Sequence, residues 1–243
     1  MGLIDSWTLG EHTADGKTFP TYRKGNGPGV IVIHEIPGLT DAVIGFGDEV
    51  VEAGYTVVMP QLFGEPGMKL ASVATAKSMA SICVRKEFTK LATRETTPMA
   101  DWLRSLAREL HGELGGPGVG ALGMCFTGGF ALAMMVDESV AAPVLCQPST
   151  PFPVGKKRAA DLNLSPADLA KVKERAAAGC EVLGLRFIGD AAVGTRFDTL
   201  TSEIGDAFIK VEFPGKQHST VTLHRQQEGV DRVLAFFDEK LSV

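Results

Sequence analysis

The chain lacks any pair of cysteines spaced as C-x-x-C. Its 243 residues include four cysteines, Cys83, Cys125, Cys146 and Cys180, each far from the next along the sequence. Such isolation disfavours zinc sites and dithiol redox centres, which need closely spaced thiols. We therefore expect a cytoplasmic protein with reduced thiols, no bound metal and one thiol of special function.

Long apolar runs, basic leaders and repeats are also missing. No apolar run reaches membrane-spanning length, and the N-terminus has no basic region followed by an apolar core. The net charge of -5 argues against nucleic acid or an anionic membrane as a partner. Because no low-complexity tract or linker divides the chain, we expect residues 1–243 to form a single domain, as a monomer or small homo-oligomer.

Short apolar segments alternate with segments of helical periodicity. Nearly continuous apolar runs are typical of parallel strands covered on both faces. Apolar residues at three- and four-residue spacing indicate helices. This order predicts an α/β fold with a mostly parallel central sheet and helices on both faces. The expected strands are 29–34, 55–59, 119–124, 142–146, 182–188 and 208–213, and the clearest helices are 98–107, 166–177 and 226–240.

Two segments depart from this pattern. Residues 7–9 and 18–22, joined across Asp15-Gly16, predict an N-terminal antiparallel hairpin at the edge of the sheet. Residues 148–163 contain prolines and a basic triplet. We expect a long surface loop there that can shape a pocket.

The most informative segment is 123–129, Gly-Met-Cys-Phe-Thr-Gly-Gly. It joins a predicted strand to an apolar helical run, which indicates a sharp turn that raises Cys125, as at the nucleophile elbow of hydrolases. Glycines at 123, 128 and 129 let strand and helix approach closely. The helix N-terminus favours the thiolate form of Cys125. The alternative is a structural cysteine buried between packing glycines.

A thiol nucleophile needs a base to take its proton. In hydrolases with such an elbow the chain order is nucleophile, acid, histidine, and only His218 and His224 follow Cys125. His218 lies in a loop after a predicted strand, at the carboxyl edge of the sheet, where sites of open α/β folds form. His218 is therefore the favoured base, and His224, nearer the last helix, is the alternative.

The orienting acid should also follow a strand. Asp190 comes directly after the strand at 182–188, whereas Asp198 and Asp206 fall on a predicted helix or at its end. We expect Asp190 to hold the histidine tautomer and to stabilise its imidazolium form.

The first parallel strand ends in His-Glu-Ile-Pro-Gly at residues 34–38, opposite the elbow if the two strands are neighbours. An oxyanion hole needs two backbone N–H groups. We expect them from Phe126, directly after the nucleophile, and from Ile36, because Pro37 has no N–H to donate. The negative charge of Glu35 would oppose a thiolate unless the side chain moves or takes a proton. The alternative is an ordinary surface glutamate at a strand end.

These residues resemble the dienelactone hydrolase family. The shared parts are the E-x-x-G loop at 35–38, the cysteine elbow at 123–129, Gly189-Asp190 and His218-Ser219, in matching order over roughly residues 15–240. The resemblance implies an α/β-hydrolase fold, a Cys-His-Asp triad, hydrolysis of lactones and related esters, and no metal or organic cofactor. It also implies that Glu35 holds or receives the thiol proton until substrate binding frees the thiolate.

Three positions depart from the family pattern. Thr127 stands where the family usually has glycine, and we expect its hydroxyl close to the oxyanion site. Pro37 stands where an aromatic residue is common, so the pocket wall should differ. Thr222 stands where relatives that act on dienelactone use an arginine to hold its carboxylate, and Arg85 is a weak candidate for a second such arginine.

We therefore predict a cofactor-free hydrolase of small esters or lactones that forms a thiol ester on Cys125. The competing class is a noncatalytic or redox-responsive protein on the same fold, because an exposed, activated cysteine also suits oxidation sensing. Hydrolysis of a panel of aryl esters and lactones would separate the two classes.

Overall fold

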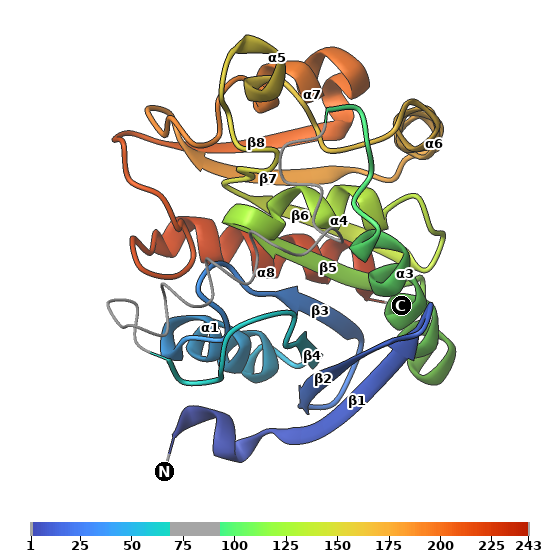
Figure 1. The fold of residues 1–243 in the computed structure, drawn as a ribbon. Helices are drawn as coiled ribbons and strands as arrows, with labels where there is room; N and C mark the ends of the chain where they lie inside the picture. The colour runs from blue at the N-terminus through green and yellow to red at the C-terminus, as the bar shows by residue number, and fades with distance from the viewer. Residues whose placement is uncertain (1, 69–92, 243) are drawn as a thin grey trace.

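The structure is a computed structural model that describes residues 2–68 and 93–242. Its described residues form one eight-stranded sheet in the order β1-β2-β4-β3-β5-β6-β7-β8 (Figure 1). The six strands β4, β3, β5, β6, β7 and β8 pair in parallel in this order. Strands β1 and β2 form an antiparallel hairpin at one edge, and β2 pairs antiparallel with β4. The strands are β1 Thr8–Ala14, β2 Lys17–Lys24, β3 Gly29–Ile33, β4 Thr56–Pro60, β5 Val119–Met124, β6 Val140–Cys146, β7 Val182–Phe187 and β8 Phe208–Phe213.

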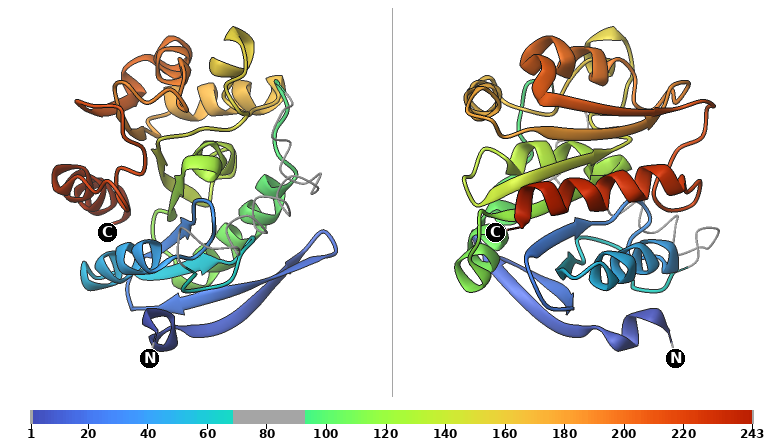
Figure 2. Two further views of the ribbon diagram at one scale, coloured as in Figure 1. Left: turned by 60° about the vertical axis from the view of Figure 1, so that its left-hand side comes forward. Right: turned by 180° about the vertical axis from the view of Figure 1, so that it is seen from behind.

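Helices cover both faces of this sheet, as predicted (Figure 2). One layer consists of α1 and α8, and the opposite layer of α3, α4, α6 and α7. In β3, Val30 and Val32 face the first layer while Ile31 and Ile33 face the second, and all four side chains are fully buried. The helices are α1 Asp41–Glu52, α3 Met99–Leu114, α4 Gly128–Met134, α5 Lys156–Ala159, α6 Pro166–Ala177, α7 Arg196–Ile204 and α8 Gln227–Leu241.

The carboxyl ends of the parallel strands meet at one edge of the sheet. There the chain leaves β3 at His34, β5 at Cys125 and β6 at Gln147. The segments after β7 and β8 carry Asp190 and His218 to the same edge. Residues far apart in the sequence are therefore brought together where open α/β sheets place their sites.

The segment 148–163 is the expected surface loop only in part, since residues 154–157 are exposed and both ends are buried. It contains the short helix α5, and Ser149, Thr150 and Asn163 are buried. The buried hydroxyls find partners, since Thr150 Oγ1 donates to the Phe126 carbonyl at 2.7 Å. The first buried end of this segment therefore lies beside the elbow. In the described part of the chain, no helix is both long and apolar enough to cross a membrane.

Candidate active site

Cys125 occupies a strained turn between β5 and α4. Its φ of 53° lies in the left-handed region, which is uncommon for a residue with a side chain. Strand and helix can approach this closely because Gly123 has no Cβ. A Cβ there would lie 2.2 Å from the Thr127 carbonyl oxygen. A Cβ at Gly128 would lie 2.6 Å from Pro148 Cα. The turn leaves the Cys125 thiol partly exposed at the sheet edge.

The imidazole of His218 lies between Asp190 and Cys125. Its Nδ1 is 2.5 Å from Asp190 Oδ2, and the ring also hydrogen bonds to the Cys125 side chain. Burial lowers the pKa of His218, but hydrogen bonds to Asp190 and Cys125, together with their negative charges, outweigh burial and raise it to about 10. The geometry therefore favours a protonated imidazole between the Asp190 side chain and the Cys125 sulfur.

The carboxylate of Asp190 is fixed on both oxygens. Oδ1 accepts a hydrogen bond from the Ala192 N–H at 2.9 Å, which leaves Oδ2 for His218. The alternative base and acid make other contacts. His224 Nδ1 is 3.0 Å from the His218 backbone carbonyl oxygen, and Asp198 is exposed on α7. Of the histidines considered from the sequence, His218 is the one beside the acid.

Ser149 is a site residue that the sequence analysis missed. Its Oγ lies 3.5 Å from Cys125 Sγ, and its backbone N–H donates to the Cys125 carbonyl at 2.9 Å. The side chain is buried, at 4% exposed, so the hydroxyl is directed by packing. The available signal was its position shortly after β6, the strand next to the elbow strand.

The loop after β3 is held by the buried His34 ring. Its Nε2 accepts the Leu62 N–H at 3.0 Å, so its Nδ1 carries the proton and donates to the Glu35 carbonyl at 3.1 Å. Burial lowers the pKa of His34 to about 4, which keeps the ring neutral. The next amide, that of Ile36, has no acceptor among the described residues. This N–H therefore remains the expected oxyanion donor of the loop.

Thr127 joins this loop to the elbow. Its fully buried hydroxyl lies 3.0 Å from the Ile33 carbonyl oxygen and 3.1 Å from that of His34, and it accepts the Met124 N–H at 3.1 Å. The hydroxyl that replaces the usual glycine thus bonds to backbone and cross-links the two segments that carry the expected oxyanion donors.

Glu35 lies differently from the position expected beside the thiol. Its Oε2 accepts the Ser219 hydroxyl at 2.8 Å, and its Oε1 accepts the Thr222 hydroxyl at 2.5 Å. Cys125 is not among its hydrogen-bond partners in the described part of the chain. The side chain is buried, at 6% exposed, so it is not an ordinary surface glutamate. Two hydroxyls next to His218 satisfy the carboxylate, which therefore pins the His218 turn.

Arg85, the expected weak substrate contact, lies outside the described residues, as does Cys83. Cys146 is fully buried, and burial raises the pKa of its thiol far above the ordinary value. Burial also raises the pKa of Cys180. Within residues 2–68 and 93–242, no group of three or more His, Cys, Asp or Glu side chains has metal-site geometry.

Comparison with known proteins identifies the family of this chain. Residues 18–163 match the model of the dienelactone hydrolase family, a range that includes the elbow and the Glu35 loop but not Asp190 or His218. Among curated proteins, none matches the chain significantly.

Solved structures of similar fold cover almost the whole chain. A dienelactone hydrolase from Anabaena variabilis is 14% identical, with a TM-score of 0.66 over 97% of this chain and 98% of that one. A cold-adapted esterase from an Arctic intertidal metagenomic library is 17% identical, with a TM-score of 0.61 over 96% and 93%. A dienelactone hydrolase-like promiscuous phosphotriesterase from metagenomic libraries is 14% identical, with a TM-score of 0.66 over 97% and 98%. The chain thus belongs to the dienelactone hydrolase family, whose members are carboxylic ester hydrolases with the α/β-hydrolase fold.

Proposed function

We propose that the protein hydrolyses small carboxylic esters or lactones through a thiol ester on Cys125, with His218 and Asp190 completing a triad. The observation that carries this proposal is the position of the His218 ring, bonded to Asp190 on one side and to Cys125 on the other. Serine hydrolases use the same arrangement with an oxygen nucleophile.

Acylation begins when the Cys125 thiolate attacks the substrate carbonyl carbon. The C=O electrons move to oxygen, and the N–H groups of Ile36 and Phe126 hold the resulting oxyanion. As the C=O bond re-forms, the C–O bond to the leaving group breaks and the His218 imidazolium donates its proton to the departing alkoxide. For a lactone, the alkoxide stays attached to the acyl group as an alcohol.

Deacylation uses the same groups in reverse. Neutral His218 takes a proton from water, and the hydroxide attacks the thiol ester carbonyl. The C–S bond breaks, which returns the Cys125 thiolate beside a protonated His218 and releases the carboxylic acid. Asp190 keeps the proton of Nδ1 in place, so that the other ring nitrogen exchanges protons in both steps.

Two further side chains assist these steps. The Ser149 hydroxyl donates to the Cys125 thiolate, which stabilises the attacking form. Before acylation Glu35 takes the proton of the resting Cys125 thiol, after its carboxylate leaves the hydroxyls of Ser219 and Thr222, and it returns this proton to the sulfur once the product has left. The similarity to a lactone hydrolase family and to an esterase supports small esters and lactones as substrates.

Activity and active-site labelling test this proposal together. We expect hydrolysis of p-nitrophenyl esters and small lactones, and a transient acyl mass on the Cys125 peptide after rapid quenching. Cys125→Ala should remove activity while the chain remains folded. His218→Ala and Asp190→Asn should lower kcat by about 10³- to 10⁴-fold, whereas His224→Ala serves as the control and should stay near wild type. Equal loss with His224→Ala, or acyl mass on another cysteine, would refute the assignment.

A further inference from the structure

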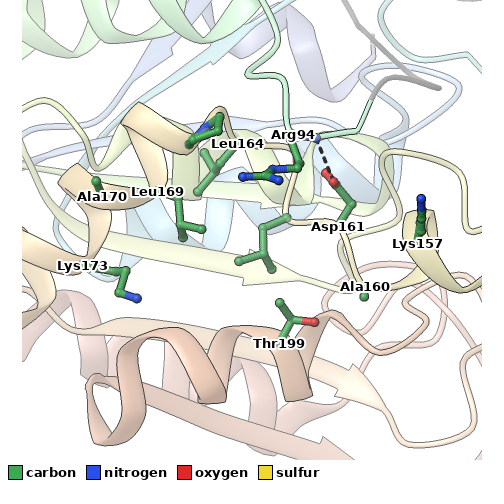
Figure 3. A pocket seen from close by; sticks show the side chains of 11 residues that line it. Arg94, Lys157, Ala160, Asp161, Leu164, Leu169, Ala170, Lys173 and Thr199 are labelled. Atoms are coloured by element: carbon green, nitrogen blue, oxygen red, sulfur yellow. Dashed lines mark hydrogen bonds between the residues drawn. The ribbon is translucent and has the colours of Figure 1, made fainter.

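A pocket separate from the Cys125 site lies beside α5, α6 and α7 (Figure 3). Its volume is about 430 Å³. This size falls in the range of about 300–1,000 Å³ typical of small-molecule sites. Cys125, Ser149, Asp190 and His218 do not line it, so its contents would not meet the reacting groups directly.

The floor of this pocket is apolar and firmly anchored. Leu162 and Leu164 are buried in the core, and Leu169 of α6 packs against the same core. Pro166, at the start of α6, and small alanine side chains complete the surface. A rigid hydrocarbon surface of this kind favours a ligand with an apolar body, because binding removes apolar area from water.

The rim of the pocket is cationic. It carries Arg94, Lys157 and Lys173 against a single carboxylate, Asp161. Lys173 is paired with Glu203 at 2.7 Å. In the described part of the chain, no salt bridge engages the Arg94 guanidinium or the Lys157 ammonium.

Asp161 does not neutralise these two cations by direct pairing. Its Oδ2 accepts the backbone N–H of Arg94 at 2.8 Å, and its Oδ1 accepts the backbone N–H of Asn163 at 2.8 Å. Figure 3 shows the Arg94 side chain extending away from this contact toward Leu164, over the pocket. The guanidinium is therefore available to an anion above the leucine floor.

We propose that this pocket binds an organic carboxylate with a medium-length hydrocarbon chain. The chain would lie on the leucines, and the carboxylate would pair with Arg94, whose planar fork matches two carboxylate oxygens. Lys157 adds attraction from the rim. This binding does not depend on the proposed hydrolysis, since none of the proposed catalytic side chains lines the pocket.

Titration of ¹⁵N-labelled full-length protein with sodium octanoate tests the proposal. Saturable NMR shifts should appear at the amides of Asp161, Leu164 and Leu169, and they should weaken as NaCl is added. The same titration with octanamide, a neutral molecule of the same length, should give at least about fivefold weaker affinity, because the ionic attraction is lost. Equal affinity for the two probes, or no saturable shift, would overturn the proposal.

Matched variants locate the site. Reversing the charge of both rim cations with Arg94→Glu and Lys157→Glu should weaken octanoate binding about tenfold or more. Lys210→Glu on the exposed side of β8 is the control for reversing a surface charge and should bind as wild type does. Cys125→Ala should also retain binding. If octanoate binding survives the double reversal, or is lost in Cys125→Ala, the ligand occupies another site and the proposal fails.

Discussion

In the described part of the chain, the Cys125 thiol hydrogen bonds to two side chains of different chemistry. His218 has a raised pKa and is the proposed base, whereas the Ser149 hydroxyl can only donate or accept a hydrogen bond. The backbone N–H of Ser149 donates to the Cys125 carbonyl, which fixes the two residues relative to each other. This arrangement directs a neutral hydroxyl, which can donate to a thiolate, at the sulfur.

Removing this donor should slow acylation. We expect Ser149→Ala to lower the rates of acylation and of iodoacetamide alkylation at neutral pH by about tenfold, because the thiolate loses a hydrogen bond to a charged group. Ser139→Ala is the matched control, since Ser139 is a buried serine just before β6, at the end of the strand away from Cys125. Mass spectrometry after brief labelling measures the alkylation. Unchanged rates in Ser149→Ala would show that the 3.5 Å contact does not stabilise the thiolate.

Glu35 allows a kinetic test of two roles. As proton acceptor for the thiol, it acts only in acylation; as the anchor of Ser219 and Thr222, it holds the turn that carries His218, which acts in both steps. We expect Glu35→Gln to slow acylation several-fold and to leave deacylation nearly unchanged. Pre-steady-state kinetics with an activated ester separates the two rates. Equal slowing of both would assign Glu35 to positioning His218, and wild-type values for both would exclude either role.

At the level of elements, the buried Arg196 at the start of α7 ties together three segments around the site. It is 2% exposed, and burial lowers its pKa to about 10, although the negative charge of Asp161 acts to raise it. The segments it joins include those that follow Ser149 and Asp190 along the chain. Its guanidinium donates to the backbone carbonyls of Pro151, Arg158, Asp161, Ala192 and Val193.

Replacing this side chain should therefore affect both stability and catalysis. Arg196→Met keeps much of the buried volume but leaves buried carbonyls without donors, and we expect a loss of about 3 kcal/mol or more in unfolding free energy. Urea unfolding measures this loss. Arg232→Met on α8, which removes a partly exposed pair with Glu239, is the control and should cost less than about 1 kcal/mol. A similarly small loss at Arg196 would contradict its role as a cross-link.

The strands were the most predictable elements because burial on both faces leaves an uninterrupted apolar run in the sequence. The hairpin was equally predictable, because its turn is formed by Asp15 and Gly16, residue types that accept the positive φ found at both positions. The helix α1 was not identified, although Thr40 caps it and Val43, Phe46 and Val50 form its buried face. Its two glycines, Gly45 and Gly47, weaken the helical pattern in the sequence.

Predictability within the site followed the same logic. Cys125, Asp190 and His218 could be chosen because each follows a recognisable strand, and the topology then brings strand ends together. Ser149 could not be chosen, because its role depends on a contact across 24 residues. The partners of Glu35 lie 184 and 187 residues away, so their hydrogen bonds follow from tertiary packing that a local pattern does not contain.

At the scale of the whole molecule, the site exists only in the folded chain, so its ionisation is linked to stability. In the unfolded chain His218 has its ordinary pKa of 6.5, and in the folded protein Asp190 and Cys125 raise it to about 10. Between these values the folded protein holds a proton that the unfolded chain has lost. The contribution of His218 to stability is therefore fully present below pH 6.5 and is lost as pH rises through 10.

This linkage predicts how stability responds to pH. Relative to His218→Gln, wild type should lose unfolding free energy steadily above pH 6.5, with a slope of at most about 1.4 kcal/mol per pH unit. Urea unfolding under reducing conditions from pH 6 to 10 measures it. In a Cys125→Ala background the loss should end at lower pH, because one of the two groups that raise the pKa of His218 is gone. A difference between wild type and His218→Gln that stays constant with pH would show that His218 does not carry the extra proton in the folded protein.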